Sequence, residues 1–272
     1  MHTQLTTNSS KFEFVAKAGF VAKGIVYSLL GLITLMAAFN INGKSTGDTD
    51  KNGVFNFLYR QPGGQVLLGL LAIGLICYCI WRLIQAFKGS SNNSGDDKKK
   101  EYVKRARYFF SALAYGSITF QVVRKLFISA SAGGNDSKES MARELLTKPF
   151  GQVLVGIGAL ILLGVGIYQL YYGYSEKYKK HVDKAVNEKS RKAMMTAGKI
   201  GYMARGIVWL LLAWLFLKAA WEANASNAGN TSKAFQFLQE LSYGAYMLAA
   251  IAFGLICYGT FNFVRARYEK FM

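Results

Sequence analysis

The sequence predicts an all-α fold: an integral membrane six-helix bundle, built from three parallel two-helix repeats with pseudo-threefold symmetry. Composition is the first reason, because 52% of the 272 residues are hydrophobic and only 18% are charged. Soluble chains average about 25% charged residues. The second reason is a series of six long apolar segments. The third is an opening phrase near the N-terminus that recurs near the C-terminus.

The six apolar segments each meet the ~20 residues needed to cross ~30 Å of hydrocarbon. They cover about residues 19–40, 63–86, 108–129, 150–173, 198–220 and 242–264. The first exceeds the roughly 7–15 residues of a signal-peptide core, so we expect a retained transmembrane helix. Six spans place both termini on one side of the membrane.

The basic residues indicate which side that is. With six spans, 23 of the 33 lysines and arginines fall on the side of the termini. This bias predicts that both termini lie in the cytoplasm. The net charge of +18 then reflects topology and contact with the anionic cytoplasmic leaflet of the lipid bilayer. Nucleic acid is not needed to explain it.

Two stretches of linker composition divide the chain into three units. Residues 89–100 are rich in Ser, Asn, Asp and Lys, and residues 176–189 are rich in Lys and Glu. The units between them cover about residues 11–88, 101–175 and 190–272. Each unit contains two of the apolar segments, and together they form one membrane domain.

The first helices of units one and three open with the same phrase, in which a basic residue follows an aromatic residue at a spacing of three. The two copies are Gly19-Phe20-Val21-Ala22-Lys23-Gly24-Ile25-Val26-Tyr27 and Gly201-Tyr202-Met203-Ala204-Arg205-Gly206-Ile207-Val208-Trp209. In unit two, Ser111 takes the basic position, Ala112 the glycine position and Tyr115 the second aromatic position. Three hairpins that enter from one side imply parallel repeats about an axis along the membrane normal.

The second helices repeat as well. Gln61-Pro62-Gly63-Gly64-Gln65-Val66-Leu67-Leu68-Gly69 is echoed by Lys148-Pro149-Phe150-Gly151-Gln152-Val153-Leu154-Val155-Gly156, and Gly74-Leu75-Ile76-Cys77-Tyr78 by Gly254-Leu255-Ile256-Cys257-Tyr258. Together with the segment Tyr78-Cys79-Ile80-Trp81-Arg82-Leu83-Ile84-Gln85-Ala86, these motifs resemble a bacterial multi-pass membrane-protein family of unknown function that is built from three two-helix repeats. The resemblance covers nearly the whole chain and implies no catalytic or ligand residues. Unit two departs from it at Ser111 and Ala112, and unit three lacks the proline.

Lys23 and Arg205 are the strongest candidate ligand-binding residues, because an ionisable group inside a span is costly and by default functional. Both can also snorkel to the headgroups and bind lipid phosphate there. The alternative is a shared interior site for an anionic or lipid-like ligand. Tyr27 and Trp209 favour the interior, because each lies four residues on, over the same face. Gly24, Gly31 and Gly206 are candidate helix-packing positions.

Tyr78, Tyr168 and Tyr258 occupy matching places in the three second helices and complete the candidate set. Such groups either bond across helices or line a polar pathway. Short amphipathic segments also recur before each second helix, at residues 54–59, 141–146 and 234–239. They are expected either to lie in the membrane interface or to form a lid over a central cavity.

Absent residue types narrow the function. Both histidines, His2 and His181, lie outside the spans, no carboxylate lies deep in a span, and no phosphate-binding loop or hydrolase motif is present. We therefore expect no cofactor, no metal and no enzymatic activity. Two functions rank above an intramembrane enzyme: a structural or accessory protein that binds lipid or partner membrane proteins, with a closed core, or a small channel or transporter for an anionic or lipid-like solute, with a wet central cavity.

Overall fold

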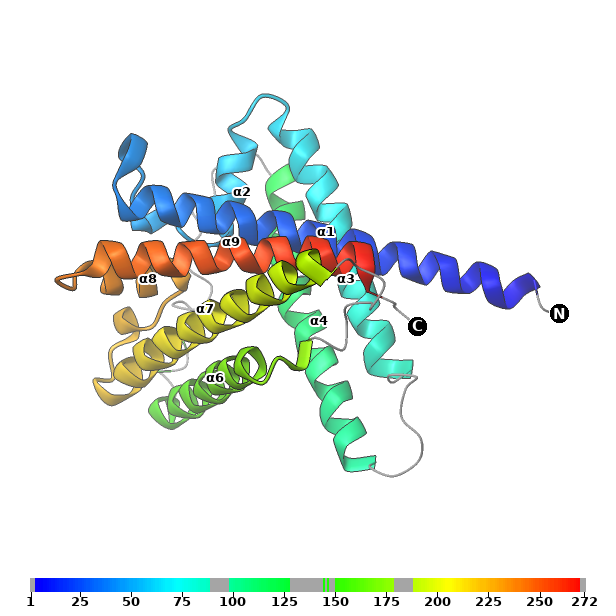
Figure 1. The fold of residues 1–272 in the computed structure, drawn as a ribbon. Coiled ribbons are helices and arrows are strands. Elements are labelled where there is room, and N and C mark those ends of the chain that lie inside the picture. The colour runs from blue at the N-terminus through cyan, green and yellow to red at the C-terminus, as the bar shows by residue number, and fades with distance from the viewer. Residues whose placement is uncertain are drawn as a thin grey trace.

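The computed structural model describes residues 3–88, 98–127, 144, 146, 150–178 and 188–269. Most of the predicted linker 89–100, much of the predicted linker 176–189 and both histidines lie outside these ranges. Within them, the chain forms eight α-helices and no strand (Figure 1). This confirms the predicted all-α class.

Five helices are long and apolar enough to cross a membrane. The spanning parts are Glu13–Ala38 of α1 (Thr3–Ala38), Gly64–Phe87 of α3 (Gly64–Lys88), the whole of α6 (Gly151–Tyr174), Arg191–Trp221 of α7 (Glu188–Trp221) and the whole of α9 (Gly244–Tyr268). The protein is therefore a multi-pass membrane protein. Helix α1 begins before the predicted start at residue 19, and an i,i+4 pair between Glu13 and Lys17 at 2.6 Å supports its polar extension.

Helix α4 (Lys98–Phe127) contains the sixth predicted span, 108–129, but is not among these apolar helices. Arg107 and Arg124 bound a stretch of 16 uncharged residues. Such a stretch measures about 24 Å as a helix, which is shorter than the ~30 Å hydrocarbon core. The sixth span therefore stays a prediction.

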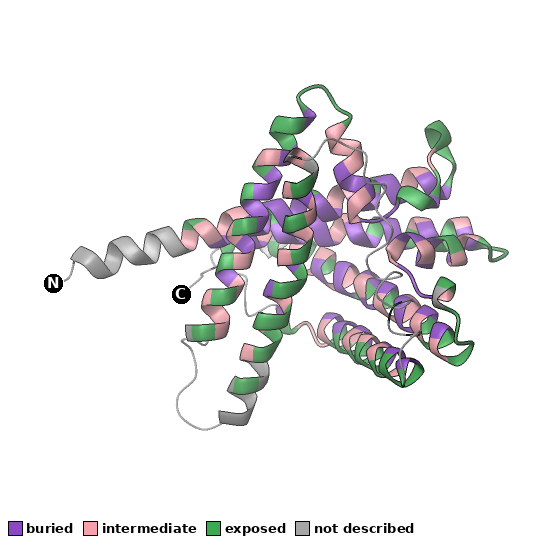
Figure 2. Ribbon diagram, turned by 180° about the vertical axis from the view of Figure 1, so that it is seen from behind, coloured by how far each residue is buried: buried purple, intermediate pink, exposed green. Residues whose placement is uncertain are grey.

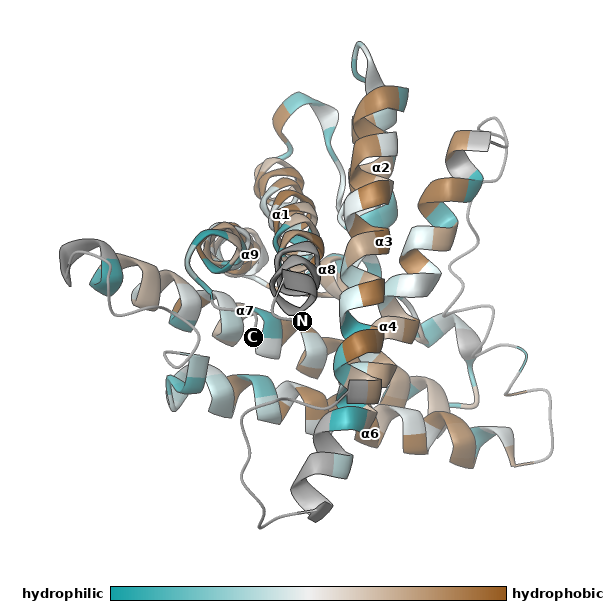
Figure 3. Ribbon diagram, turned by 90° about the vertical axis from the view of Figure 1, so that its right-hand side faces the viewer, coloured by the Kyte–Doolittle hydropathy of each residue, from teal (hydrophilic) through white to brown (hydrophobic). Residues whose placement is uncertain are grey.

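The long helices pack as three pairs, and each pair joins two different repeats. Helix α1 packs on α9, α3 on α4, and α6 on α7. In Figure 3, α1 and α9 are seen end-on, while α3 and α4 run up the page and α6 and α7 run across it. The pairs thus point in different directions. Within a repeat, α1 also contacts α3 and α7 contacts α9, whereas the described parts of α4 and α6 share no comparable contact.

Buried residues concentrate where the three pairs meet (Figure 2). The outer faces of α3 and α6 instead carry exposed apolar side chains, such as Val66, Leu70, Leu160 and Ile161. Exposed apolar stripes of this kind are expected where a helix faces lipid rather than water.

Two equivalent glycines bring the helices of a repeat into close contact. A Cβ on Gly19 would lie 2.7 Å from the Cα of Tyr78, and a Cβ on Gly201 would lie 2.6 Å from the Cα of Tyr258. Only glycine permits this approach, because real Cβ atoms do not come so close to a neighbouring backbone. Repeats one and three therefore pack their two helices in the same way.

The three glycines singled out from the sequence also lie at helix contacts. A Cβ would meet Phe263 at Gly24, the carbonyl oxygen of Ala252 at Gly31, and Leu170 at Gly206, at 2.6 to 2.7 Å. The first two positions join α1 to α9, and the third joins α7 to α6.

Two short helices, α2 (Lys51–Tyr59) and α8 (Thr231–Gln239), form before the returning helices α3 and α9. Asp50 and Asn230 cap them, each accepting a hydrogen bond from a backbone N–H of its own helix. The Asn230 side chain also donates a hydrogen bond of 2.9 Å to the Asp50 carboxylate. The equivalent caps of repeats one and three thus meet each other.

Both short helices turn their apolar faces into the protein. Phe55 is 2% exposed and Phe235 is fully buried. Of the two interpretations drawn from the sequence, the structure thus favours a cover over the core. The third amphipathic segment, 141–146, lies mostly outside the described residues.

Candidate functional site

Lys23 lies in the interior of the protein, where α1, α3, α4 and α9 meet. Its side chain is 4% exposed, and its Nζ donates a hydrogen bond of 3.4 Å to the hydroxyl of Tyr78. Tyr78 is itself 1% exposed. Of the two alternatives for Lys23, this position favours the interior over snorkelling to the headgroups.

Arg205 makes the equivalent contact in repeat three. Its guanidinium donates a hydrogen bond of 2.5 Å to the hydroxyl of Tyr258. Hence in both repeats the basic residue of the first helix reaches the tyrosine of the second helix.

The same basic residues also contact the second aromatic residue of a neighbouring repeat. Arg205 lies over the ring of Tyr27 at 5.0 Å, and Lys23 lies over the ring of Tyr115 at 5.5 Å. The rings pack correspondingly, with centroids 4.8 Å apart for Tyr27 and Tyr258, and 4.5 Å apart for Tyr78 and Tyr115. The contact from repeat one to repeat two thus resembles the contact from repeat three to repeat one.

Lys51, the first residue of α2, adds a third cation to this region. Each of three tyrosine rings lies between 4.5 and 5.8 Å from two of the cations. The pairs that share a ring are Lys23 and Lys51 at Tyr115, Lys51 and Arg205 at Tyr27, and Arg205 and Lys23 at Tyr258. We call these six residues the cation–tyrosine ring.

The charge of the cation–tyrosine ring is mainly positive. None of its three cations forms an ion pair with a carboxylate that the structure describes. The two carboxylate oxygens of Asp50, which precedes Lys51 in the chain, accept hydrogen bonds from the Gly53 N–H and from Asn230. At an effective dielectric constant of about 20, any two unit positive charges roughly 10 Å apart repel each other by roughly 1.7 kcal/mol.

The pKa of Lys51 reflects this environment. Burial, followed by the Arg205 guanidinium, lowers the pKa of Lys51 from 10.5 to about 8, while Asp50 opposes the shift. A bound anion would stabilise the cationic form of Lys51 and raise this pKa again.

A cavity of about 70 Å³ opens beside Lys51 and Arg205. Because a buried water occupies roughly 10–15 Å³ of such volume, the space would admit several waters or one tetrahedral oxyanion. The hydroxyl of Tyr115 is buried beside that of Tyr27, which lines the cavity. The cavity is lined by Tyr27, Leu30, Lys51, Arg205, Val208, Trp209, Leu212, Thr231 and Leu255.

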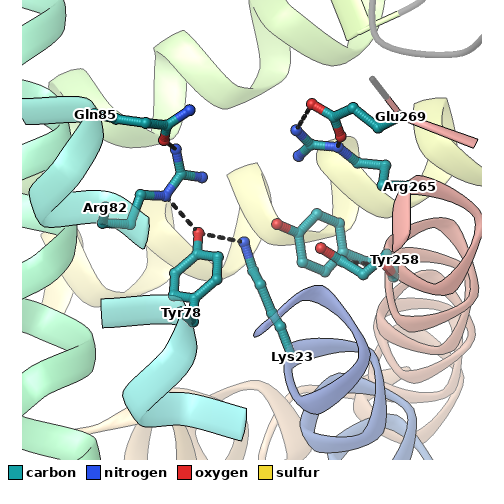
Figure 4. Close-up of polar contacts among 8 residues, drawn as sticks. Lys23, Tyr78, Arg82, Gln85, Tyr258, Arg265 and Glu269 are labelled. Atoms are coloured by element: carbon teal, nitrogen blue, oxygen red, sulfur yellow. Dashed lines mark hydrogen bonds and ion pairs between the residues drawn. The ribbon is translucent and has the colours of Figure 1, made fainter. Parts of the chain in front are cut away.

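A second group of basic residues lies on the other side of Lys23, toward the C-terminal ends of α3 and α9 (Figure 4). Arg82 donates hydrogen bonds to Tyr78, at 2.9 Å, and to Gln85, at 2.8 Å. Arg265 donates two hydrogen bonds to Glu269, at 2.5 and 2.8 Å. We call Lys23, Arg82 and Arg265 the inner cluster.

The contacts recur between units of the chain that all match the same family model. A family model described as "Domain of Unknown Function (DUF1206)" matches the chain three times, over residues 18–89, 106–176 and 200–269. The chain belongs to the DUF1206 family. This confirms the resemblance to a family built from three repeats.

One relative matches this chain along nearly its whole length. The chain is 28% identical over 254 residues to "Uncharacterized protein YxxB" of Bacillus subtilis (strain 168), which covers 93% of this chain and 90% of that protein. No solved structure matches the chain.

All three DUF1206 repeats contribute to the cation–tyrosine ring, but unequally. Repeat one supplies Lys23, Tyr27 and Lys51, repeat two supplies only Tyr115, and repeat three supplies Arg205 and Tyr258. Because repeat two has serine at the basic position, it provides no third equivalent of the basic contact.

Tyr168 lies apart from the other two predicted tyrosines. Its side chain is 43% exposed, and its hydroxyl accepts a hydrogen bond of 2.7 Å from Arg107. Helix α6 packs along α7 and meets α4 at this hydrogen bond, so its tyrosine points to Arg107 rather than to the cation–tyrosine ring. Trp209, by contrast, lines the cavity.

Sequence reasoning missed Lys51, Arg82 and Arg265 as site residues. It assigned all three to topology, Lys51 to an extramembrane link and Arg82 and Arg265 to the cytoplasmic ends of spans. One signal was available for Lys51: it follows the helix cap Asp50, just as Thr231 follows Asn230 in repeat three, and both Lys51 and Thr231 line the cavity.

Proposed function

We propose that this DUF1206 protein is an accessory membrane protein that binds a phosphate-like oxyanion in the cavity beside Lys51 and Arg205. The ligand is either the headgroup of an anionic lipid or a free oxyanion. The proposed role is binding rather than catalysis, and it involves no metal or cofactor.

The observation that carries this proposal is the surplus of positive charge around a cavity of matching size. A guanidinium presents paired donors that fit a phosphate or sulfate, and Lys51 adds an ammonium to the same cavity lining. Tyr27, Tyr115 and Thr231 offer hydroxyl groups nearby. The N-terminal ends of α2 and α8 also approach this cavity, and helix N-termini favour anions.

We further propose that the six long helices surround one pseudo-threefold axis through the cation–tyrosine ring. In the order α1, α3, α4, α6, α7, α9, all neighbours pack closely, including α9 with α1, except α4 and α6, whose described parts meet through the Arg107–Tyr168 hydrogen bond. The two equivalent basic-to-aromatic contacts between repeats support the same cyclic order. A third such contact, from repeat two to repeat three, would need a basic residue where repeat two has Ser111.

In this proposal α4 is the sixth span, and both termini lie on the cytoplasmic side of a bacterial inner membrane. The charge bias supports this orientation, and Arg124 can snorkel at the outer end of the short apolar stretch of α4. A cysteine introduced at Gly43, between α1 and α2, should then react with an impermeant thiol reagent added outside intact cells, whereas one at Glu13 should not. Equal labelling of both positions would contradict the orientation.

Binding is tested with purified protein in nanodiscs and radiolabelled sulfate. We expect saturable binding that falls at least tenfold in Lys51→Gln and Arg205→Gln. Lys44→Gln is the matched control, because Lys44 lies over the Phe57 ring at 5.3 Å and outside the cavity lining. Its affinity should equal that of the wild type.

A second experiment distinguishes a bound lipid headgroup from a bound free oxyanion. Native mass spectrometry of gently extracted protein should show a retained anionic lipid if the ligand is a headgroup, and Arg205→Gln should lose it. The same spectra would show any partner membrane subunit that remains attached. The proposed function would be contradicted if the wild type bound no sulfate and also retained no phosphate-bearing molecule.

A further inference from the structure

The basic side chains do not end at the cavity. From Arg205 they continue past the Tyr258 ring to Lys23, whose Nζ lies 5.2 Å from that ring, and then to Arg82 and Arg265. Figure 4 shows Arg82 and Arg265 on either side of the tip of the Lys23 side chain. A series of basic side chains thus extends from the cavity toward the C-terminal ends of α3 and α9.

Arg265 is a second buried member of the inner cluster, beside Lys23. It is 9% exposed and lies over the ring of Phe20 at 4.3 Å. Glu269 lies four residues further on, directly after the end of α9. Arg265 donates hydrogen bonds to both carboxylate oxygens of Glu269. This is the paired geometry by which a guanidinium also binds phosphate or sulfate.

We propose that the inner cluster is a second anion-binding station, joined to the cavity past Tyr258 and Tyr78, and that the Glu269 carboxylate occupies it as an internal anion. When an oxyanion displaces Glu269 from Arg265, the two stations form a path for anions across the membrane. The protein then conducts oxyanions slowly, because its own carboxylate competes for the inner station. This inference rests on the proposed binding of an oxyanion at the cavity.

Neutralising the internal carboxylate should therefore increase transport. In proteoliposomes, we expect Glu269→Gln to take up radiolabelled sulfate at least tenfold faster than the wild type. The matched control is Glu13→Gln, because Glu13 also pairs with a cation four residues away, Lys17, but at the surface. That control should transport at the wild-type rate. Adding Arg205→Gln to Glu269→Gln should abolish the increase, which excludes a non-specific leak.

The outcomes separate this inference from the proposed function. Sulfate binding at the cavity with no faster uptake in Glu269→Gln would overturn the inner station and leave the binding function intact. Absence of sulfate and lipid-phosphate binding in the wild type would overturn both. If Glu269→Gln does not fold, Glu269→Asp keeps the charge but shortens the side chain, and it should also raise uptake. An unchanged rate in that folded variant would equally refute the inference.

Discussion

Binding of an oxyanion beside Lys51 should weaken as the pH rises above about 8. The pKa of Lys51 is lowered to about 8, so the side chain is mostly cationic at pH 7 and mostly neutral at pH 9. An anion binds the cationic form more tightly, and by linkage its binding raises the pKa of Lys51. Affinity is therefore highest below the pKa and is lost as the pH passes through it.

The magnitude follows from the protonated fraction. With a pKa of about 8, that fraction falls from about nine-tenths at pH 7 to about one-tenth at pH 9, so sulfate affinity should fall about tenfold, or roughly 1.4 kcal/mol. Folding without ligand should show the opposite trend. Between about pH 8 and 10.5 the unfolded chain binds more protons at Lys51, so this group adds stability as the pH rises.

Isothermal titration with sulfate at pH 7, 8 and 9 tests the prediction, because sulfate does not change its own charge over this range. The Lys51→Met variant should bind more weakly and show no such pH dependence. A wild-type affinity that stays constant, or that rises with pH, would refute the placement of Lys51 beside the anion.

Three further changes test the packing that supports the site, each by thermal unfolding in detergent. Gly201→Ala should destabilise the protein by about 1–3 kcal/mol through overpacking, whereas Gly69→Ala, with no atom within 4 Å of the added Cβ, should not; equal effects would contradict the close helix contact. Tyr258→Phe removes the acceptor of a charged hydrogen bond and should cost about 1.5–3 kcal/mol; a neutral effect would contradict that bond. Asp50→Ala and Asn230→Ala should each cost about 0.5–2 kcal/mol and should not be additive, since strict additivity would mean that the two caps do not interact.

Much of the fold followed from the sequence because the membrane imposes strict demands on it. Spans must be about 20 residues long and apolar, and five of the six predicted segments meet these criteria as helices. The exception was α4, where charges at both ends shorten the apolar stretch. Neighbouring repeats could not be paired from the sequence, because a periodic pattern does not say which faces meet.

The candidate site was only partly visible for the same reason. Lys23 and Arg205 could be singled out because a charge inside a span is costly. The sequence placed Tyr27 over the same face as Lys23, but in the structure Lys23 lies over Tyr115 of the next repeat. Lys51 was hidden because a lysine in an extramembrane link is ordinary unless the link folds back over the core.

The most direct test of the binding function is a crystal of the protein soaked in selenate, a heavier analogue of sulfate with an anomalous X-ray signal. We predict a single strong anomalous peak in the cavity, within hydrogen-bonding distance of both the Lys51 ammonium and the Arg205 guanidinium. Selenate found only at surface lysines, with nothing between these two residues, would contradict the account.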